Sequence, residues 1–275
     1  MIIDAHQHFW QLSRDDYGWL TPDLEPLFRD FMPDDLAPHL RQHGIEGTIL
    51  VQAAPTLAET EFLLDKADKT PFVFGVVGWT DLAAKSAASD IARLAKHPKL
   101  VGLRPMIQDI ADDDWMLRPD LTPAFEAMIA CDLTFDALVL PRHLSQLRQL
   151  LFRHPKLRTV IDHGAKPDIS GRQFDDWAND IAVIAKESGA YCKLSGLLTE
   201  AGKDWTINDV APYFAHLLEH FGSERLVWGS DWPVLTMAAS YETWLDMTVT
   251  LIPDERARQA ILGSNAVELY RVSET

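Results

Sequence analysis

The sequence predicts a single α/β domain, a (β/α)8 barrel of the TIM type, over residues 1–275. Eight short apolar segments alternate with longer segments of helical periodicity, which is typical of a parallel sheet whose strands are joined by helices. The length of 275 residues is close to the roughly 250 residues of such a barrel. Neither a G-x-G-x-x-G nor a G-x-x-x-x-G-K motif occurs, which argues against an open nucleotide-binding sheet.

The predicted strands are almost continuous in apolar residues, as is usual for strands that are buried on both faces. Several of them end at a polar residue, and in a barrel the carboxyl ends of the strands form the face that carries the active site. The predicted strands span residues 2–6, 48–52, 72–77, 100–104, 133–137, 158–163, 190–194 and 226–231.

Signals for helix termini separate the strands. Pro33 starts one helix and Gly44 ends it, and Pro123 starts another. Two acidic, irregular segments, 11–30 and 109–123, follow strands and are predicted to fold over the mouth of the barrel as lids. Further helices are predicted over residues 59–69, 83–96, 143–153, 174–188, 208–221, 241–251 and 254–262.

The composition excludes several classes of protein and partner. A hydrophobic fraction of 47% with 24% charged residues fits a folded core and not a disordered chain. The net charge of −16 argues against nucleic acid or an anionic membrane surface as a partner. The amino terminus lacks a signal-peptide pattern, and Cys131 and Cys192 form no disulfide framework, so we expect a cytoplasmic protein. The oligomeric state stays open.

Two histidines close the first predicted strand, His6 and His8. Because strand side chains alternate with a period of two, both imidazoles lie on the same face, which in a barrel is the interior. Two adjacent imidazoles can bind a divalent cation or polarise a carbonyl group. An H-x-H pair alone could equally be hydrogen-bonded within a turn.

The sixth and eighth predicted strands also end in ionisable residues, His163 and Asp231. Asp231 alone could be a helix N-cap, because Pro233 follows it. Three separate strands, however, direct His6, His8, His163 and Asp231 toward one opening, and this convergence favours a catalytic role for all four.

The combination resembles the amidohydrolase superfamily, in which an H-x-H pair on the first strand, a histidine on the sixth and an aspartate on the eighth surround the reacting water. More narrowly, the chain is similar to the branch of sugar-lactone and pyrone lactonases, and the similarity extends nearly end to end. It implies a hydrolase that opens a lactone ring. The segments that carry this resemblance are residues 4–10, 77–79, 162–167, 193–196 and 229–233.

The sequence departs from the metal-dependent members of that superfamily. Those members carry a histidine or a carbamylated lysine at the end of the fourth or fifth strand, where this chain has Arg104 and Asp136. A two-metal site is therefore not expected. We predict that no cofactor is required, and the alternative is a single divalent metal such as zinc, held by His6, His8 and Asp231.

Lactone hydrolysis needs a base for the attacking water and positive charge near the carbonyl oxygen. Asp231 is the predicted base, and His6, His8 and His163, together with Arg104, are predicted to polarise the carbonyl. After ring opening, protonated Asp231 would return its proton to the leaving alkoxide.

Five residues are predicted to bind the substrate. Arg104 and Lys166 can hold hydroxyl or carboxylate oxygens, although an ion pair for Arg104 and solvent exposure for Lys166 are the alternatives. Trp10 and Trp79 can pack against a sugar ring, and Gln52 can bind a hydroxyl group. Core packing is the alternative for at least one of the tryptophans.

Three other functions compete with a sugar-lactone hydrolase. A pyrone or muconolactone-type lactone is one alternative substrate, but a pyrone dicarboxylate would need several arginines at the mouth, and only Arg104 and Arg142 qualify. A metal-dependent decarboxylase would share the H-x-H pair and the strand-eight aspartate. A barrel without catalysis, serving as a binding protein, would be expected to have lost a polar member of the cluster.

Overall fold

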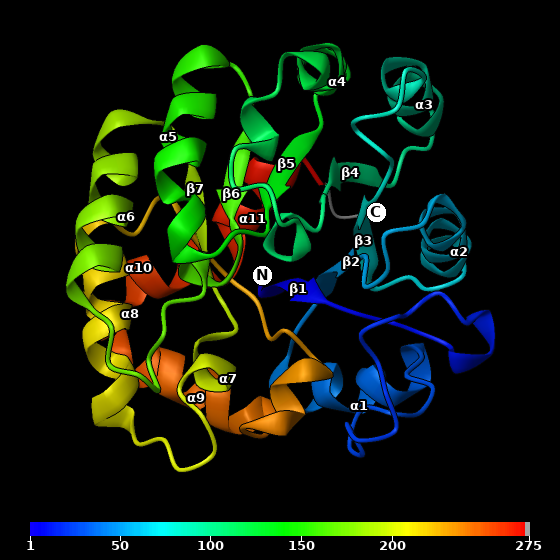
Figure 1. The fold of residues 1–275 in the computed structure, drawn as a ribbon. Coiled ribbons are helices and arrows are strands. Elements are labelled where there is room, and N and C mark those ends of the chain that lie inside the picture. Colours follow the sequence, from blue (N-terminus) through cyan, green and yellow to red (C-terminus); the bar gives the residue numbers. More distant parts are fainter. Residues whose placement is uncertain (273–275) are drawn as a thin grey trace.

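The barrel consists of eight parallel strands that pair in sequence order in the computed structural model, which describes residues 1–272 (Figure 1). All seven adjacent pairs are parallel. The strands are β1 (Ile3–Gln7), β2 (Gly47–Val51), β3 (Val73–Gly78), β4 (Leu100–Leu103), β5 (Thr134–Ala137), β6 (Thr159–Ile161), β7 (Tyr191–Leu194) and β8 (Leu226–Trp228).

Two backbone hydrogen bonds join the last strand to the first. The amide of Asp231 donates to the carbonyl of His6 at 2.8 Å, and the amide of His8 donates to the carbonyl of Trp232 at 2.8 Å. These bonds lie just beyond the carboxyl end of β8, so the sheet closes next to the predicted catalytic residues. The predicted single (β/α)8 barrel is confirmed.

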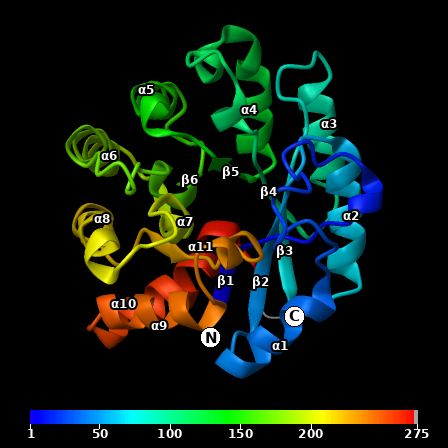
Figure 2. The same cartoon turned by 60° about the horizontal axis from the view of Figure 1, so that its bottom comes forward.

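Helices surround the strands on the outside (Figure 2). Pro33 lies in the first turn of its helix and Gly44 ends it with a left-handed φ of 66°, as their types predict. The helices are α1 (Pro33–His43), α2 (Leu57–Asp68), α3 (Ala87–Leu94), α4 (Thr122–Ala130), α5 (Leu144–Arg153), α6 (Asp175–Glu187), α7 (Leu197–Glu200), α8 (Ile207–Phe221), α9 (Tyr241–Leu251), α10 (Glu255–Gln259) and α11 (Asn265–Tyr270).

Several element boundaries differ from the prediction. The predicted helix over 83–96 begins only at Ala87, because the carboxylate of Asp81 accepts from the amide of Ala83 and forms a turn there. The segment 254–262 divides into α10 and a π-helical turn. Helices α7 and α11 were not predicted, because segments of 4 and 6 residues are too short to show a helical period.

Four of the eight predicted strands extend too far at their carboxyl ends. Gln52, Arg104, His163 and Asp231 were assigned to strands but lie just after them. His163 and Asp231 have φ values of 54° and 58°, a left-handed conformation that no strand residue adopts. The chain therefore leaves the sheet at the positions where functional side chains are needed.

The core has two layers. A large apolar cluster lies between the strands and the surrounding helices, and a smaller one fills the barrel interior. The interior cluster includes Ile3 and Val101 near the amino ends of their strands, and Leu269 and Tyr270 of α11 belong to the same cluster. Helix α11 thus closes the amino end of the barrel, and the polar side chains are left for the carboxyl end.

No helix within residues 1–272 combines the length and the apolar character needed to cross a membrane.

Close packing explains one glycine beside the predicted site. Gly196 has a φ of 66°, and a Cβ atom there would lie 2.7 Å from Cγ of His163. We expect Gly196→Ala to lower the thermal unfolding midpoint by at least about 4 °C, which corresponds to about 2 kcal/mol, because the backbone is strained and the His163 ring must move. Circular dichroism during heating measures this midpoint.

Gly189→Ala is the matched control, because no atom lies within 4 Å of a Cβ built at Gly189. Equal midpoints for the two variants would show that the contact with His163 imposes no constraint.

Candidate active site

The four predicted catalytic residues meet at the carboxyl end of the barrel. Oδ1 of Asp231 lies 3.2 Å from Nε2 of His8, 3.6 Å from Nε2 of His6 and 4.0 Å from Nε2 of His163. The ring centroid of His6 is 4.9 Å from that of His8 and 4.6 Å from that of His163. All four side chains are buried. The carboxylate is therefore surrounded by three imidazoles.

Backbone and buried polar contacts hold this arrangement. Asp4, at the start of β1, accepts hydrogen bonds from the amide of Ser230 at 2.8 Å, its hydroxyl at 2.6 Å and the hydroxyl of Tyr241 at 2.9 Å. Ser230 directly precedes Asp231, so Asp4 fixes the loop that presents the carboxylate. His163 is oriented separately, because its Nδ1 lies 2.8 Å from Oγ of Ser195.

The contacts of His8 define where its protons lie. Nδ1 of His8 is 2.8 Å from the carbonyl oxygen of Val51, and because a carbonyl can only accept, Nδ1 carries a hydrogen. Nε2 is 3.2 Å from the carboxylate of Asp231, a contact that is attractive only if a proton lies between the two atoms. Burial alone would raise the pKa of Asp231, but His163, His8 and His6 hold it below its usual range. The shared proton therefore belongs to His8, and Asp231 is ionised.

A cluster of buried charges lies beneath the histidines. Nζ of Lys193 lies 2.5 Å from Oδ2 of Asp136, 2.9 Å from Oδ1 of Asp162 and 3.1 Å from Nδ1 of His6. The hydroxyl of Tyr270 donates to the same oxygen of Asp136 at 2.7 Å. We call Asp136, Asp162, Lys193, Tyr270 and His6 the buried ionic cluster. The ammonium group of Lys193 has three protons, one for each of its close neighbours Asp136, Asp162 and His6.

The pKa values of the two carboxylates in this cluster are shifted in opposite directions. Burial raises the pKa of Asp136 to about 6 even though Lys193 is in contact with it. Burial also opposes ionisation of Asp162, but Lys193, His6 and Arg104 together hold its pKa well below the usual range. Burial and the positive charge of Lys193 keep the pKa of His6 well below its usual value, so His6 is neutral.

Arg104 connects the buried ionic cluster to the cavity above it. Its Nη1 lies 3.2 Å from both Oδ2 of Asp162 and Nε2 of His6, and its Nη2 donates to the carbonyl of Gln52. The side-chain amide of Gln52 donates in return to the carbonyl of Arg104 at 2.7 Å. Arg104 therefore forms the ion pair considered as its alternative, and it also lines the cavity.

The cavity above the histidines has a volume of about 190 Å³. It contains three of the predicted catalytic residues, while His6 lies buried below them. Lys166 and Arg104 supply its positive charge, and Lys166 is only 3.6 Å from the carboxylate of Glu200. The lining residues are His8, Trp19, Ala53, Arg104, Met106, Gln108, Asp109, Leu138, His163, Lys166, Asp231 and Val234.

The other predicted substrate-binding residues lie outside this cavity. Trp10 is fully buried, its indole N–H donates to the carbonyl of Arg29 at 2.7 Å, and it packs edge-on against Trp19. Trp10 therefore follows the core-packing alternative. Gln52 is also fully buried and supports Arg104. Trp79 lines a neighbouring groove.

Two groups of residues at this site were not predicted from the sequence. Lys193 interrupts an apolar strand, and a buried lysine almost always has a charged partner, so this signal was available. Trp19, Met106 and Leu138 come from irregular segments or follow strands directly, and no period or motif distinguishes them from other apolar residues.

Three side chains form a group that could hold a metal ion, namely His6, His163 and Asp231. One ligand atom from each lies within 4.8 Å of the others, so His163 replaces the predicted His8 in this set. Two imidazoles and a carboxylate are ligands that suit zinc. However, Nη1 of Arg104 lies 3.2 Å from Nε2 of His6 and places a positive charge beside the nitrogen that a metal would use. This arrangement does not fit a divalent ion at His6.

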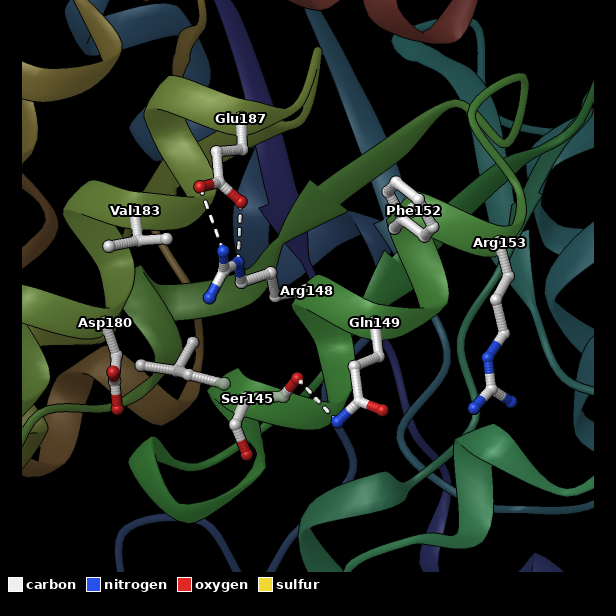
Figure 3. Close-up of a pocket in the computed structure, with 9 residues that line it drawn as sticks. Ser145, Arg148, Gln149, Phe152, Arg153, Asp180, Val183 and Glu187 are labelled. Atoms are coloured by element: carbon white, nitrogen blue, oxygen red, sulfur yellow. Dashed lines mark hydrogen bonds and ion pairs between the residues drawn. The ribbon is translucent and has the colours of Figure 1, made fainter.

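A separate surface groove between α5 and α6 contains none of the predicted site residues (Figure 3). Its volume is about 470 Å³, and the Arg148 guanidinium spans it with two hydrogen bonds of 2.6 and 2.9 Å to Glu187. Phe152 stands 87% exposed at its rim. This groove lies in the outer helical layer and brings no catalytic groups together.

A family model described as amidohydrolase matches residues 3–272. The chain is 47% identical to an L-fucono-1,5-lactonase of Burkholderia ambifaria, over 98% of this chain and 95% of the relative. It is 34% identical to an L-fucono-1,5-lactonase of Burkholderia multivorans, over 99% and 96% of the two chains. A crystal structure of an amidohydrolase from Burkholderia multivorans with bound zinc superposes with a TM-score of 0.95, at 32% identity over 99% of this chain and 100% of that one.

Removal of the central cation tests the buried ionic cluster. Lys193→Met leaves Asp136 and Asp162 buried without their counter-ion, so we expect the free energy of unfolding to fall by about 3–5 kcal/mol. Urea denaturation followed by tryptophan fluorescence measures this change. Lys69→Met is the control, because Lys69 pairs with Asp65 on the exposed surface and should change stability little. A similar small effect of both substitutions would exclude the proposed role of Lys193.

The burial of His163 predicts an unusual titration. Burial disfavours the imidazolium and lowers the pKa of His163 to about 4, so this ring should stay neutral down to about pH 5. Nuclear magnetic resonance of protein with isotopically labelled histidine, assigned with His163→Gln, gives the midpoint directly. A midpoint near the ordinary value of about 6.5 would contradict this environment.

Proposed function

This chain belongs to the amidohydrolase family, and we propose that it is a lactonase that hydrolyses the ring ester of a sugar aldonolactone. The family model that matches residues 3–272 confirms the resemblance to amidohydrolases that was noted in the sequence. The two L-fucono-1,5-lactonases that match nearly the whole chain support a deoxysugar lactone as the substrate.

The observation that carries this proposal is the carboxylate of Asp231 on the floor of a small cavity whose walls carry cations. Asp231 is ionised and bonded to His8, and the guanidinium of Arg104 and the ammonium of Lys166 line the same cavity. A base next to fixed positive charge is what attack of water on an ester requires. The volume of about 190 Å³ suits one small ring and is below the roughly 300–1,000 Å³ of sites for larger ligands.

In the first step, Asp231 accepts a proton from a water molecule as the water oxygen bonds to the lactone carbonyl carbon. The carbonyl oxygen becomes an oxyanion, and Arg104 and Lys166 stabilise it. His6 has a different role from the one that the sequence predicted, because it is buried below the cavity. It contacts Asp231 from beneath and helps to fix the orientation of the carboxylate.

In the second step, the tetrahedral intermediate collapses and the bond between the carbonyl carbon and the ring oxygen breaks. The ring oxygen leaves as an alkoxide and takes the proton from Asp231. Because the pKa of Asp231 lies below its usual range, its protonated form is a strong acid and gives up this proton readily. The product is an open-chain hydroxy acid, and the carboxylate is restored for the next cycle.

The charges at the cavity favour a neutral polyol lactone over a pyrone dicarboxylate. Arg142 was one of two arginines that could have bound such a dianion. It donates instead to Asp113 at 2.8 Å and to the carbonyl of Gln108 at 3.1 Å, and it does not line the cavity. Arg104 and Lys166 are the cationic side chains of the cavity within the described part of the chain, and each already has an acidic neighbour.

Loss of the base tests the mechanism. We expect Asp231→Asn to lower kcat for L-fucono-1,5-lactone hydrolysis by at least about 100-fold, because general-base catalysis is worth about that much. The assay follows acid release and subtracts spontaneous hydrolysis. Asp180→Asn, on the outer surface at α6, is the control and should retain full activity. Near-normal turnover by Asp231→Asn with an intact fold would rule out this base.

Chelator treatment separates the lactonase from a metal-dependent enzyme. Because the guanidinium of Arg104 lies beside the nitrogen of His6 that a metal would need, lactone hydrolysis should persist unchanged after metal removal, and the prepared protein should contain well under one equivalent of metal. Metal analysis together with assays before and after chelation makes this measurement. Hydrolysis that stops on chelation and returns with zinc would contradict the metal-free mechanism.

A decarboxylase is tested separately. Release of carbon dioxide from a carboxylated substrate, stopped by a chelator, would favour a decarboxylase.

A further inference from the structure

A second and larger hollow adjoins the catalytic cavity. Its volume is about 590 Å³, compared with about 190 Å³ for the catalytic cavity, and both are lined by Trp19, Met106 and Asp109. We call it the tryptophan groove. Its lining residues are Asp16, Gly18, Trp19, Pro55, Trp79, Thr80, Asp81, Leu82, Pro105, Met106, Asp109, Ile110 and Trp115.

Parts of both predicted lid segments build this groove. The segment 11–30 contributes Trp19, and the segment 109–123 contributes Trp115. An antiparallel bridge between Trp10 and Phe31 ties the two ends of the first segment together. The loops after β2, β3 and β4 supply the other walls, with Pro55, Trp79 and Met106. These segments therefore form the side walls of an open groove that leads into the catalytic cavity.

The side chains in the groove combine flat apolar faces with hydrogen-bonding groups. The indole N–H of Trp19 donates to the carbonyl of Ala53 at 2.7 Å, which fixes the plane of that ring. Within residues 1–272, the indole N–H groups of Trp79 and Trp115 have no protein acceptor and are not enclosed by the protein. Oδ1 of Asp16 is a buried acceptor without a partner.

This combination matches the chemistry of a neutral sugar ring. The C–H face of a sugar packs on an indole ring, and its hydroxyl groups donate to carboxylates and accept from indole N–H groups. Three carboxylates, Asp16, Asp81 and Asp109, line the groove, and its described lining contains no lysine or arginine. An acidic sugar or another anion would therefore be repelled.

We propose that the tryptophan groove is a second subsite, which binds the non-reacting sugar of an aldobionolactone, a disaccharide whose terminal residue is a lactone. This inference rests on the proposed function, because the lactone ring must occupy the catalytic cavity. The catalytic cavity has room for one ring, and the shared wall of Trp19 and Met106 is where the glycosidic bond passes from one hollow to the other.

The kinetic test compares a monosaccharide lactone with the lactones of cellobionic and lactobionic acid. Trp115 lines the groove but not the catalytic cavity. Trp115→Leu should lower kcat/KM for a disaccharide lactone at least about 5-fold, since an aromatic stacking contact is lost. It should leave kcat/KM for the monosaccharide lactone within about 2-fold. Phe152→Leu is the matched control, because this exposed ring lies outside both hollows, and it should change neither value.

A binding measurement distinguishes a failure of the second subsite from a failure of the proposed lactonase function. Calorimetric titration with the product acids should show that wild-type protein binds an aldobionic acid at least about 10-fold more tightly than gluconic acid, and that Trp115→Leu removes most of this difference. Equal affinities for the two acids, with equal kcat/KM values for the two kinds of lactone, would overturn the second subsite. Failure of every lactone to be hydrolysed would overturn the proposed function, while the titration would still decide whether the groove binds a sugar.

Discussion

The seam between the first and last strands is the constraint on which the site depends. The hydrogen bond from the Asp231 amide to the His6 carbonyl closes the barrel and, by the same contact, brings the carboxylate against the imidazoles. Gly229 is needed at this seam, because a Cβ atom there would lie 2.6 Å from Cβ of His6. Asp4 then holds the loop through Ser230. The same contacts thus close the barrel and assemble the site.

Beneath the seam, the buried ionic cluster determines the chemical state of the histidines. Lys193 faces Nδ1 of His6 and Arg104 faces Nε2, so that both nitrogens of this ring meet positive charge. Lys193 and Arg104 stabilise the buried carboxylate of Asp162, and the same two cations make His6 a poor metal ligand. His8 has the carbonyl of Val51 at one nitrogen and the carboxylate of Asp231 at the other. His8 is therefore protonated at both nitrogens, unlike His6.

Much of this architecture follows from the sequence alone, because each feature leaves a local pattern. The barrel, its helices and the convergence of His6, His8, His163 and Asp231 follow from strand position and residue type. What could not be predicted depends on contacts between distant segments. The left-handed turn at His163 and the burial of Trp10 by Trp19 and Phe31 have no local signal that distinguishes them from alternatives. Lys193 stands out in its apolar strand, but nothing local identifies Asp136 and Asp162 as its partners.

His8 holds the proton in its pair with Asp231, so that an ionised carboxylate is available to accept a proton from water. Neutron diffraction of deuterated crystals at neutral pH would locate this proton directly, which X-ray data at ordinary resolution do not. We expect deuterium on both ring nitrogens of His8 and none on the carboxylate of Asp231. Deuterium on Asp231, with Nε2 of His8 bare, would contradict it.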